Sequence, residues 1–191
     1  MGAPEAGQGP STHPGSTDVV PGHDWPGHAV LQVPVVELED WVVARTRHYD
    51  SSFVSADPQF HHAHITVLAP MTRWDTEAIG ALAASMSPFD YELDRVDAFA
   101  DGTIYLHADP VGRFKEMTAR ARQAHPNVRP FGGEDPLPHL TLDRVGDAVD
   151  LVSTERMLDG LLPVGGHADA LELVWYRSSE CRLIQRWPLG S

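Results

Sequence analysis

HITV at residues 64–67 and HLTL at residues 139–142 share one pattern, in which histidine and threonine alternate with aliphatic residues. Random placement of the same composition yields about 0.02 matches to this pattern, so two matches are informative. Alternation of this kind is typical of a β-strand with one face in the core. Each motif therefore predicts a strand that presents its histidine and its threonine on the same face.

The segments around the two motifs follow the same order, strand–helix–strand–helix–strand, and the two histidines lie 75 positions apart. Residue identity between the halves is low, so the pattern of secondary structure repeats rather than the sequence. This order predicts an α+β fold with two lobes related by an approximate two-fold, mostly antiparallel sheets, outer helices and a central cleft. The repeats span residues 28–100 and 102–187 of one bilobal domain, residues 28–189. Residues 1–27, rich in Gly and Pro, are expected to form a disordered leader.

Composition and charge exclude several classes of protein. The chain carries 27 acidic and 14 basic residues, a formal net charge of −13, which disfavours coating of long nucleic acid or an anionic membrane. This net charge is compatible with a short phosphorylated ligand that binds in a local pocket. The single cysteine, Cys181, excludes a disulfide framework and cysteine-rich metal sites. No apolar run reaches the roughly 18 residues of a membrane span, and no signal-peptide pattern occurs, so a cytoplasmic monomer is expected.

A two-fold relation between the halves brings both motif strands to one cleft, with the imidazoles of His64 and His139 opposed across it. Imidazoles act as general base and general acid near neutral pH, and their reference pKa of about 6.5 predicts a rate optimum at about pH 6–7.5. The hydroxyls of Thr66 and Thr141 can donate hydrogen bonds to the non-bridging oxygens of a bound phosphate. The constellation predicts in-line cleavage of a phosphodiester without a metal or other cofactor.

The two motifs, their separation and the duplicated halves resemble the two-histidine phosphoesterase superfamily, which includes 2'-5' RNA ligase-like proteins and 2',3'-cyclic phosphodiesterases. The resemblance covers about residues 28–189, and its most specific parts are HAHITVLAP, LPHLTLDR and the C-terminal WYRSSECRLIQRWPL. It implies a phosphoric diester hydrolase acting on a cyclic or 2',5'-linked nucleotide or short RNA, with a reverse, ligase-like reaction. The implied catalytic residues are His64, Thr66, His139 and Thr141.

Four further residues are candidates for substrate binding. The resemblance implies that Arg144 contacts the phosphate, although strand parity places Arg144 on the face opposite His139 unless a bulge or strand end intervenes. His62 is expected in the cleft wall, and Tyr176 and Phe131 lie where a base could stack.

Two other functions stay open at this point. One is a metal-dependent hydrolase built on the cluster of His61, His62 and His64, because His62 and His64 share a strand face. It requires a further ligand from elsewhere in the chain. The other is a non-catalytic or pathway-dedicated binder of a phosphorylated metabolite.

Overall fold

The structure is a computed structural model that describes residues 25–190, so all but three residues of the expected leader, 1–27, lie outside the described residues. The described chain contains eight strands, four α-helices and two short 3₁₀ turns. The strands are β1 (His28–Pro34), β2 (His64–Met71), β3 (Phe89–Ala98), β4 (Thr103–Asp109), β5 (His139–Arg144), β6 (Val164–Ala168), β7 (Ala170–Tyr176) and β8 (Arg182–Pro188). The helices are α1 (Glu39–Asp50), α2 (Thr76–Ser85), α3 (Val111–Ala124) and α4 (Leu151–Met157), with turns at Val36–Leu38 and Ser51–Phe53.

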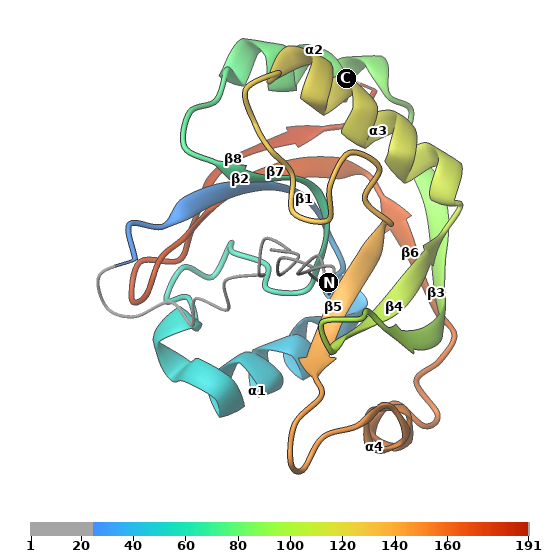
Figure 1. Ribbon diagram of the computed structural model, residues 1–191. Helices are drawn as coiled ribbons and strands as arrows, with labels where there is room; N and C mark the ends of the chain where they lie inside the picture. Colours follow the sequence, from blue (N-terminus) through green and yellow to red (C-terminus); the bar gives the residue numbers. More distant parts are fainter. Residues whose placement is uncertain (1–24, 191) are drawn as a thin grey trace, which may run out of the picture.

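All eight strands form one curled antiparallel sheet in the order β6-β3-β4-β5-β2-β1-β7-β8 (Figure 1). The order is symmetric about the junction of β2 and β5, where the two halves of the sheet meet. The chain crosses that junction twice. After β2 it crosses to β3, which pairs with β4, and after β6 it crosses back to β7, which pairs with β1. The expected α+β class is confirmed, with the two halves joined in a continuous sheet.

The helices cover the sheet where its apolar side chains project. In Figure 1, α2 and α3 lie side by side along one side of the sheet, whereas α1 and α4 lie at the opposite end of the molecule. Asp75 starts α2, because its carboxylate accepts hydrogen bonds from two N–H groups of the first helical turn. The apolar faces of α2 and α3, including Ile79 and Phe114, pack in the main core with sheet residues such as Leu31 and Leu68.

The motif strands have the expected alternation. In β2, Ile65 and Val67 are buried, whereas His64 and Thr66 are only partly buried. Since these two aliphatic residues belong to the main core, the histidine and the threonine occupy the other face of the sheet.

The C-terminal quarter differs in detail from the expected pattern. Spaced leucines predict a helix from Leu151 to Leu162, but α4 ends at Met157, and β6 follows where no separate strand is predicted. Gly166 explains the weak strand signal, because a Cβ there would lie 2.3 Å from the Tyr91 ring, which packs directly on the backbone. No helix within residues 25–190 has the length and apolar character that a membrane span requires.

Candidate active site

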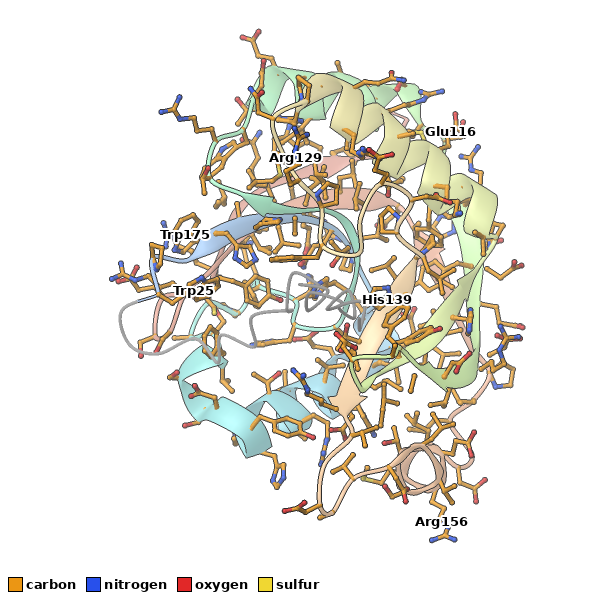
Figure 2. All side chains as sticks on the ribbon, in the orientation of Figure 1. Trp25, Glu116, Arg129, His139, Arg156 and Trp175 are labelled. Atoms are coloured by element: carbon orange, nitrogen blue, oxygen red, sulfur yellow. The ribbon has the colours of Figure 1, made fainter. Side chains whose placement is uncertain are left out.

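The two motif strands are direct neighbours, because β2 and β5 pair with Ile65 opposite Leu140. In an antiparallel pair, the adjacent positions on either side are also opposed. Each histidine therefore lies opposite the threonine of the other motif: His64 beside Thr141, and His139 beside Thr66. The imidazoles do not oppose one another across a cleft between separate sheets. They lie diagonally on one face of the shared sheet, and Figure 2 shows His139 near the centre of the curl.

Both imidazoles are held in the same way. His64 Nδ1 lies 2.7 Å from the carbonyl oxygen of His62, and His139 Nδ1 lies 2.6 Å from that of Leu137. A carbonyl only accepts, so each Nδ1 carries the hydrogen and donates it to the backbone two residues upstream. The Nε2 atom of each neutral ring is then an acceptor, free of this backbone contact and suited to act as a general base.

Burial controls the protonation of both rings. It lowers the pKa of His64 to about 4, because desolvation disfavours the imidazolium, and the neighbouring His139 lowers it further. The hydrogen bond to His62 and the carboxylates of Glu39 and Glu172 oppose this shift. Burial also lowers the pKa of His139, against the opposing effect of its hydrogen bond to Leu137. Both imidazoles are therefore poised as neutral bases, and a bound anionic phosphate would raise both pKa values.

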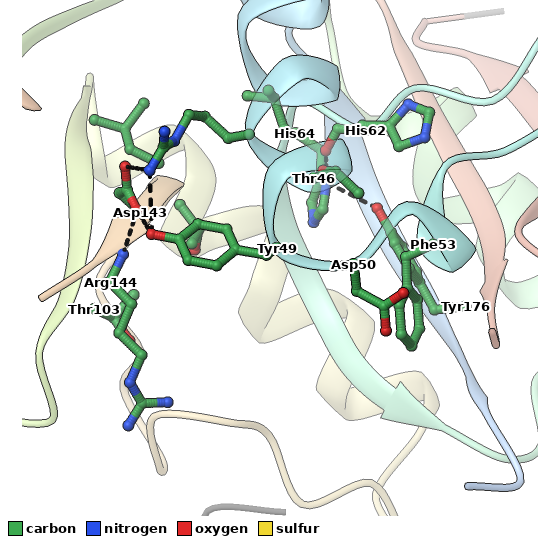
Figure 3. A pocket seen from close by; sticks show the side chains of 14 residues that line it. Thr46, Tyr49, Asp50, Phe53, His62, His64, Thr103, Asp143, Arg144 and Tyr176 are labelled. Atoms are coloured by element: carbon green, nitrogen blue, oxygen red, sulfur yellow. Dashed lines mark hydrogen bonds and ion pairs between the residues drawn. The ribbon is translucent and has the colours of Figure 1, made fainter. Parts of the chain in front are cut away.

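Two cavities open on the face that carries the motifs. One, of about 640 Å³, is lined by His64 and by side chains of α1 (Figure 3). The other, of about 550 Å³, is lined by His139 and Thr66. Thr141 and Thr103 line both cavities, so the two spaces meet at these hydroxyls. Thr103 was not a candidate from the sequence, because an isolated threonine at the start of a strand carries no motif.

A β-bulge places Arg144 on the motif face. Ile104 of β4 pairs with Asp143, whereas Tyr105 pairs with Thr141, so Leu142 is an extra residue in β5. The extra residue reverses the alternation beyond it. Arg144 consequently lines the same cavity as His64 and Thr141, and its Nη2 donates to the carbonyl oxygen of Asp101 at 3.3 Å.

The residue before Arg144 ties this strand end to α1. Asp143 is buried and forms an ion pair with Arg45, and it also accepts a hydrogen bond from the Tyr49 hydroxyl (Figure 3). Arg45 Nη2 in turn donates to the Tyr49 oxygen at 3.2 Å. Arg45 and Tyr49 show helical spacing in the sequence, which predicts a packing face but not a contact with a residue 94 positions away from Tyr49.

The other three candidates for substrate binding occupy different places. Tyr176 lines the cavity of His64, and its hydroxyl lies 3.3 Å from His64 Nδ1. Phe131 lines the cavity of His139 and is 61% exposed, which leaves its ring accessible for stacking. His62 lines the first cavity but is buried, and both of its ring nitrogens have protein partners. Its Nδ1 contacts Glu39 at 2.7 Å, and its Nε2 accepts from the Ser55 N–H at 3.0 Å.

The histidine cluster at the start of β2 does not converge on one point. His61 contacts Glu172 at 2.8 Å, His62 contacts Glu39, and His64 contacts a backbone carbonyl. Within residues 25–190, no group of three or more His, Cys, Asp or Glu side chains is arranged to hold a metal ion. The three rings act instead as separate hydrogen-bonding groups at the start of the motif strand.

The sequence matches the model of a known protein family over most of its length. The model of the 2'-5' RNA ligase superfamily matches residues 32–180, a segment that contains both motifs and both cavities. The chain belongs to the 2'-5' RNA ligase superfamily. No curated protein matches the chain. The resemblance to two-histidine phosphoesterases is thereby confirmed.

Solved structures share the fold of this 2'-5' RNA ligase superfamily chain. E. coli LigT complexed with 3'-AMP has a TM-score of 0.54 and 19% identity, and the match covers 87% of this chain and 99% of that chain. A protein of Thermus thermophilus has a TM-score of 0.57 and 18% identity, with 86% and 98% covered. A structure described as a phosphoesterase has a TM-score of 0.53 and 16% identity, with 87% and 99% covered. At these identities the likeness shows a common fold.

Proposed function

We propose that this chain is a metal-independent phosphodiesterase acting on a cyclic or 2',5'-linked phosphodiester of a nucleotide or short RNA, with a reverse, ligase-like reaction. The observation that carries the proposal is the pairing of β2 with β5, which sets two imidazoles and two threonine hydroxyls side by side on one accessible face. Membership of the superfamily supports phosphodiesterase-type chemistry, and the LigT structure with 3'-AMP supports a nucleotide as ligand.

The chemistry follows from the geometry of the rings. One imidazole takes a proton from water through Nε2, and the water oxygen forms a bond to phosphorus. The ester P–O bond opposite breaks, and the other imidazole, protonated, delivers its proton to the departing oxygen. Hydrogen bonds from Thr66 and Thr141 stabilise the charge that develops on the non-bridging oxygens, and Arg144 adds a cation on the same face. In the ligating direction an alcohol takes the place of water: it attacks the phosphorus of a cyclic diester and gives its proton to one imidazole, and the ring ester oxygen leaves with a proton from the other imidazole.

A single chain supplies every group that this mechanism uses. Both histidines, both threonines and Arg144 come from β2 and β5 of one molecule, so a monomer suffices. The acidic net charge of −13 favours a small or short substrate over a long nucleic acid.

The decisive experiment is a turnover screen of purified protein with 2',3'-cyclic nucleotides, 2',5'-linked dinucleotides and cyclic oligonucleotides. We expect hydrolysis of at least one class, lowered about 10²–10⁴-fold in His64→Ala and in His139→Ala and unchanged by EDTA. Loss of activity with EDTA and recovery with zinc or manganese would support the metal-dependent alternative. Tight binding without turnover of any class would support the non-catalytic binder.

A further inference from the structure

A third cavity, of about 390 Å³, lies between the segment that joins β2 to α2 and the segment that follows α3. Its wall shares no residue with the cavities of His64 and His139. In Figure 2, Arg129 of this wall lies beside α2 and α3, whereas His139 lies near the centre of the curl. The volume falls within the range of small-molecule pockets. This cavity is therefore a candidate ligand site separate from the motif face.

A buried histidine holds the two segments together. His125 Nε2 accepts a hydrogen bond from the Asp75 N–H at 3.1 Å, and His125 Nδ1 donates to the Ala121 carbonyl oxygen at 3.0 Å. The carbonyl oxygen of His125 accepts from the Val128 N–H at 3.1 Å. Both ring nitrogens have protein partners, and the ring is the neutral tautomer with its hydrogen on Nδ1. These contacts fix the backbone of both segments, so the cavity wall is preformed.

Each segment contributes one guanidinium group to the cavity, from Arg73 and from Arg129. Within the described part of the chain, neither group has a hydrogen-bond or ion-pair partner. In the His64 cavity, by contrast, Arg45 pairs with Asp143, and Arg144 donates to a backbone carbonyl. Two cations at one cavity repel each other, and an anion held between them reverses this cost. The arrangement therefore favours an anionic ligand.

The one carboxylate among the residues of this wall belongs to Asp75, and it is used elsewhere. It accepts hydrogen bonds from the Glu77 and Ala78 N–H groups at the start of α2, at 3.0 and 3.1 Å. Because His125 is neutral, the wall carries two positive charges and one negative charge, in a chain whose net charge is −13. This local positive excess favours a small anion, since the acidic remainder of the surface repels a long polyanion.

The chemistry of the wall identifies the class of anion. A guanidinium fork can donate two hydrogen bonds to one phosphate, and two such groups match the charge of about −2 on a phosphate monoester. The remaining wall includes the Trp74 indole and the side chains of Pro126 and Val128, which suit an organic group. The indole is held in place beside Trp175, at 6.4 Å between ring centroids.

We propose that this cavity binds a small phosphate monoester, with the phosphate between the guanidinium groups of Arg73 and Arg129 and the organic part against Trp74. The inference is independent of the proposed phosphodiesterase function, because none of these residues lines a cavity of the motif face.

The test follows the indole N–H signal of Trp74 by NMR in ¹⁵N-labelled protein at physiological salt. The chain has five tryptophans, and the indole signal that is missing in Trp74→Phe identifies Trp74. The protein is titrated with adenosine 5'-monophosphate, inorganic phosphate and adenosine. We expect a saturable shift with the monophosphate, a higher Kd for inorganic phosphate and no saturable shift with adenosine. No saturable shift with the monophosphate would overturn the inference, and so would a Kd for either other compound at or below that of the monophosphate.

Paired variants assign the binding to the two guanidinium groups. Arg73→Gln combined with Arg129→Gln should raise the Kd of the monophosphate at Trp74 by about tenfold or more, because charged donors to the phosphate are lost. Arg47→Gln combined with Arg156→Gln removes the same charge from exposed positions of α1 and α4, at the opposite end of the molecule in Figure 1. This control should keep the Kd within about twofold of wild type.

An unchanged Kd in the first pair, with a native circular dichroism spectrum, would overturn the inference, as would an equal rise of the Kd in both pairs. Binding on the motif face is tested separately with His64→Ala and His139→Ala. Both should leave the Kd at Trp74 unchanged, and a rise of about tenfold in either would place the ligand on the motif face and overturn the inference. Loss of phosphodiesterase activity in these variants has no bearing on the result.

Discussion

Ile65 and Leu140 face each other across the junction where the two halves of the sheet meet. This one pair fixes the register of both motifs, so each imidazole has the threonine of the other motif as its neighbour. Neither half of the chain contains the whole of the proposed phosphate site, because each half supplies one histidine and one threonine to the diagonal arrangement. The proposed site is therefore a single one, at the junction of the two halves of the sheet.

Replacement of either histidine tests the acid–base pair. We expect His64→Ala and His139→Ala each to lower kcat by about 10²–10⁴-fold with a smaller change in KM, because each ring moves a proton in the transition state. The double variant should lose much less than the product of the single losses, because the rings act as a unit. Steady-state kinetics with circular dichroism as a folding control measure this, and multiplicative losses would show two independent roles.

Removal of a threonine hydroxyl tests the phosphate contact. Thr66→Val and Thr141→Val keep the branched shape and remove one donor, so each should lower kcat/KM by about tenfold to hundredfold, the scale of one hydrogen bond to a charged group. Thr72→Val, on the exposed segment after β2, is the control and should leave kcat/KM unchanged. Wild-type kinetics in both motif variants would exclude the hydroxyls from the site.

The residues that the sequence predicts well are those whose signal is local. Alternation in HITV and HLTL indicates both the strands and the shared face of each His–Thr pair, and the cores of α2 and α3 follow from apolar spacing. The elements it predicts less well depend on distant parts of the chain. The strand β6 contains Gly165 and Gly166, and glycine weakens the sequence signal of a strand. The Tyr91 ring packed on Gly166, from a distant strand, explains the second of these glycines.

In the candidate site, too, some features have a local sequence signal and others depend on distant parts of the chain. The motifs predict the positions of the histidines and the threonines. The direct pairing of the two motif strands depends on the strand order of the whole sheet, in which β3 and β7 each lie across the junction from the strand that precedes them in the chain. Arg144 illustrates the difference most clearly. Its place on the motif face depends on an extra residue at Leu142, and that bulge is visible only in the register with β4. The partners of Asp143, on α1, likewise lie nearly 100 positions away.

The pH profile tests the effect of burial on the rings. Activity needs one neutral and one protonated imidazole, so kcat/KM, which reports the free enzyme, should follow a bell between the two pKa values. Both lie below 6.5, with His64 at about 4, so the maximum of kcat/KM should lie on the acid side of pH 6.5. Above that pH the protonated fraction falls, and kcat/KM should fall with it.

The profile of kcat should be shifted to higher pH, because a bound anionic phosphate stabilises the imidazolium in the complex. This shift brings kcat towards the optimum of about pH 6–7.5 that reference values suggest. Rates measured from pH 4 to 9 at constant ionic strength separate the two profiles. A maximum of kcat/KM above pH 7 would show that burial does not set these pKa values.

Glu39 provides the last test, because it acts on His64 through the backbone. Its carboxylate accepts hydrogen bonds from His62 N–H, His62 Nδ1 and Ala63 N–H, at 3.0, 2.7 and 2.9 Å. Burial alone would raise the pKa of Glu39, but these contacts outweigh it and the pKa is lowered, so the group is ionised at neutral pH. The carbonyl oxygen of the same His62 orients His64, which makes Glu39 a positioning residue for the imidazole.

Glu39→Gln weakens these contacts, since an amide accepts hydrogen bonds only through its oxygen. We expect the free energy of unfolding to fall by about 1–3 kcal/mol in denaturant titrations, and kcat to fall more than KM rises. Asp40→Asn removes a carboxylate from the next, exposed position of the same helix and should change neither quantity. A stability loss in Glu39→Gln with unchanged kcat and an unchanged pH profile would reduce its role to anchoring β2, because the orientation of His64 would then be independent of the carboxylate.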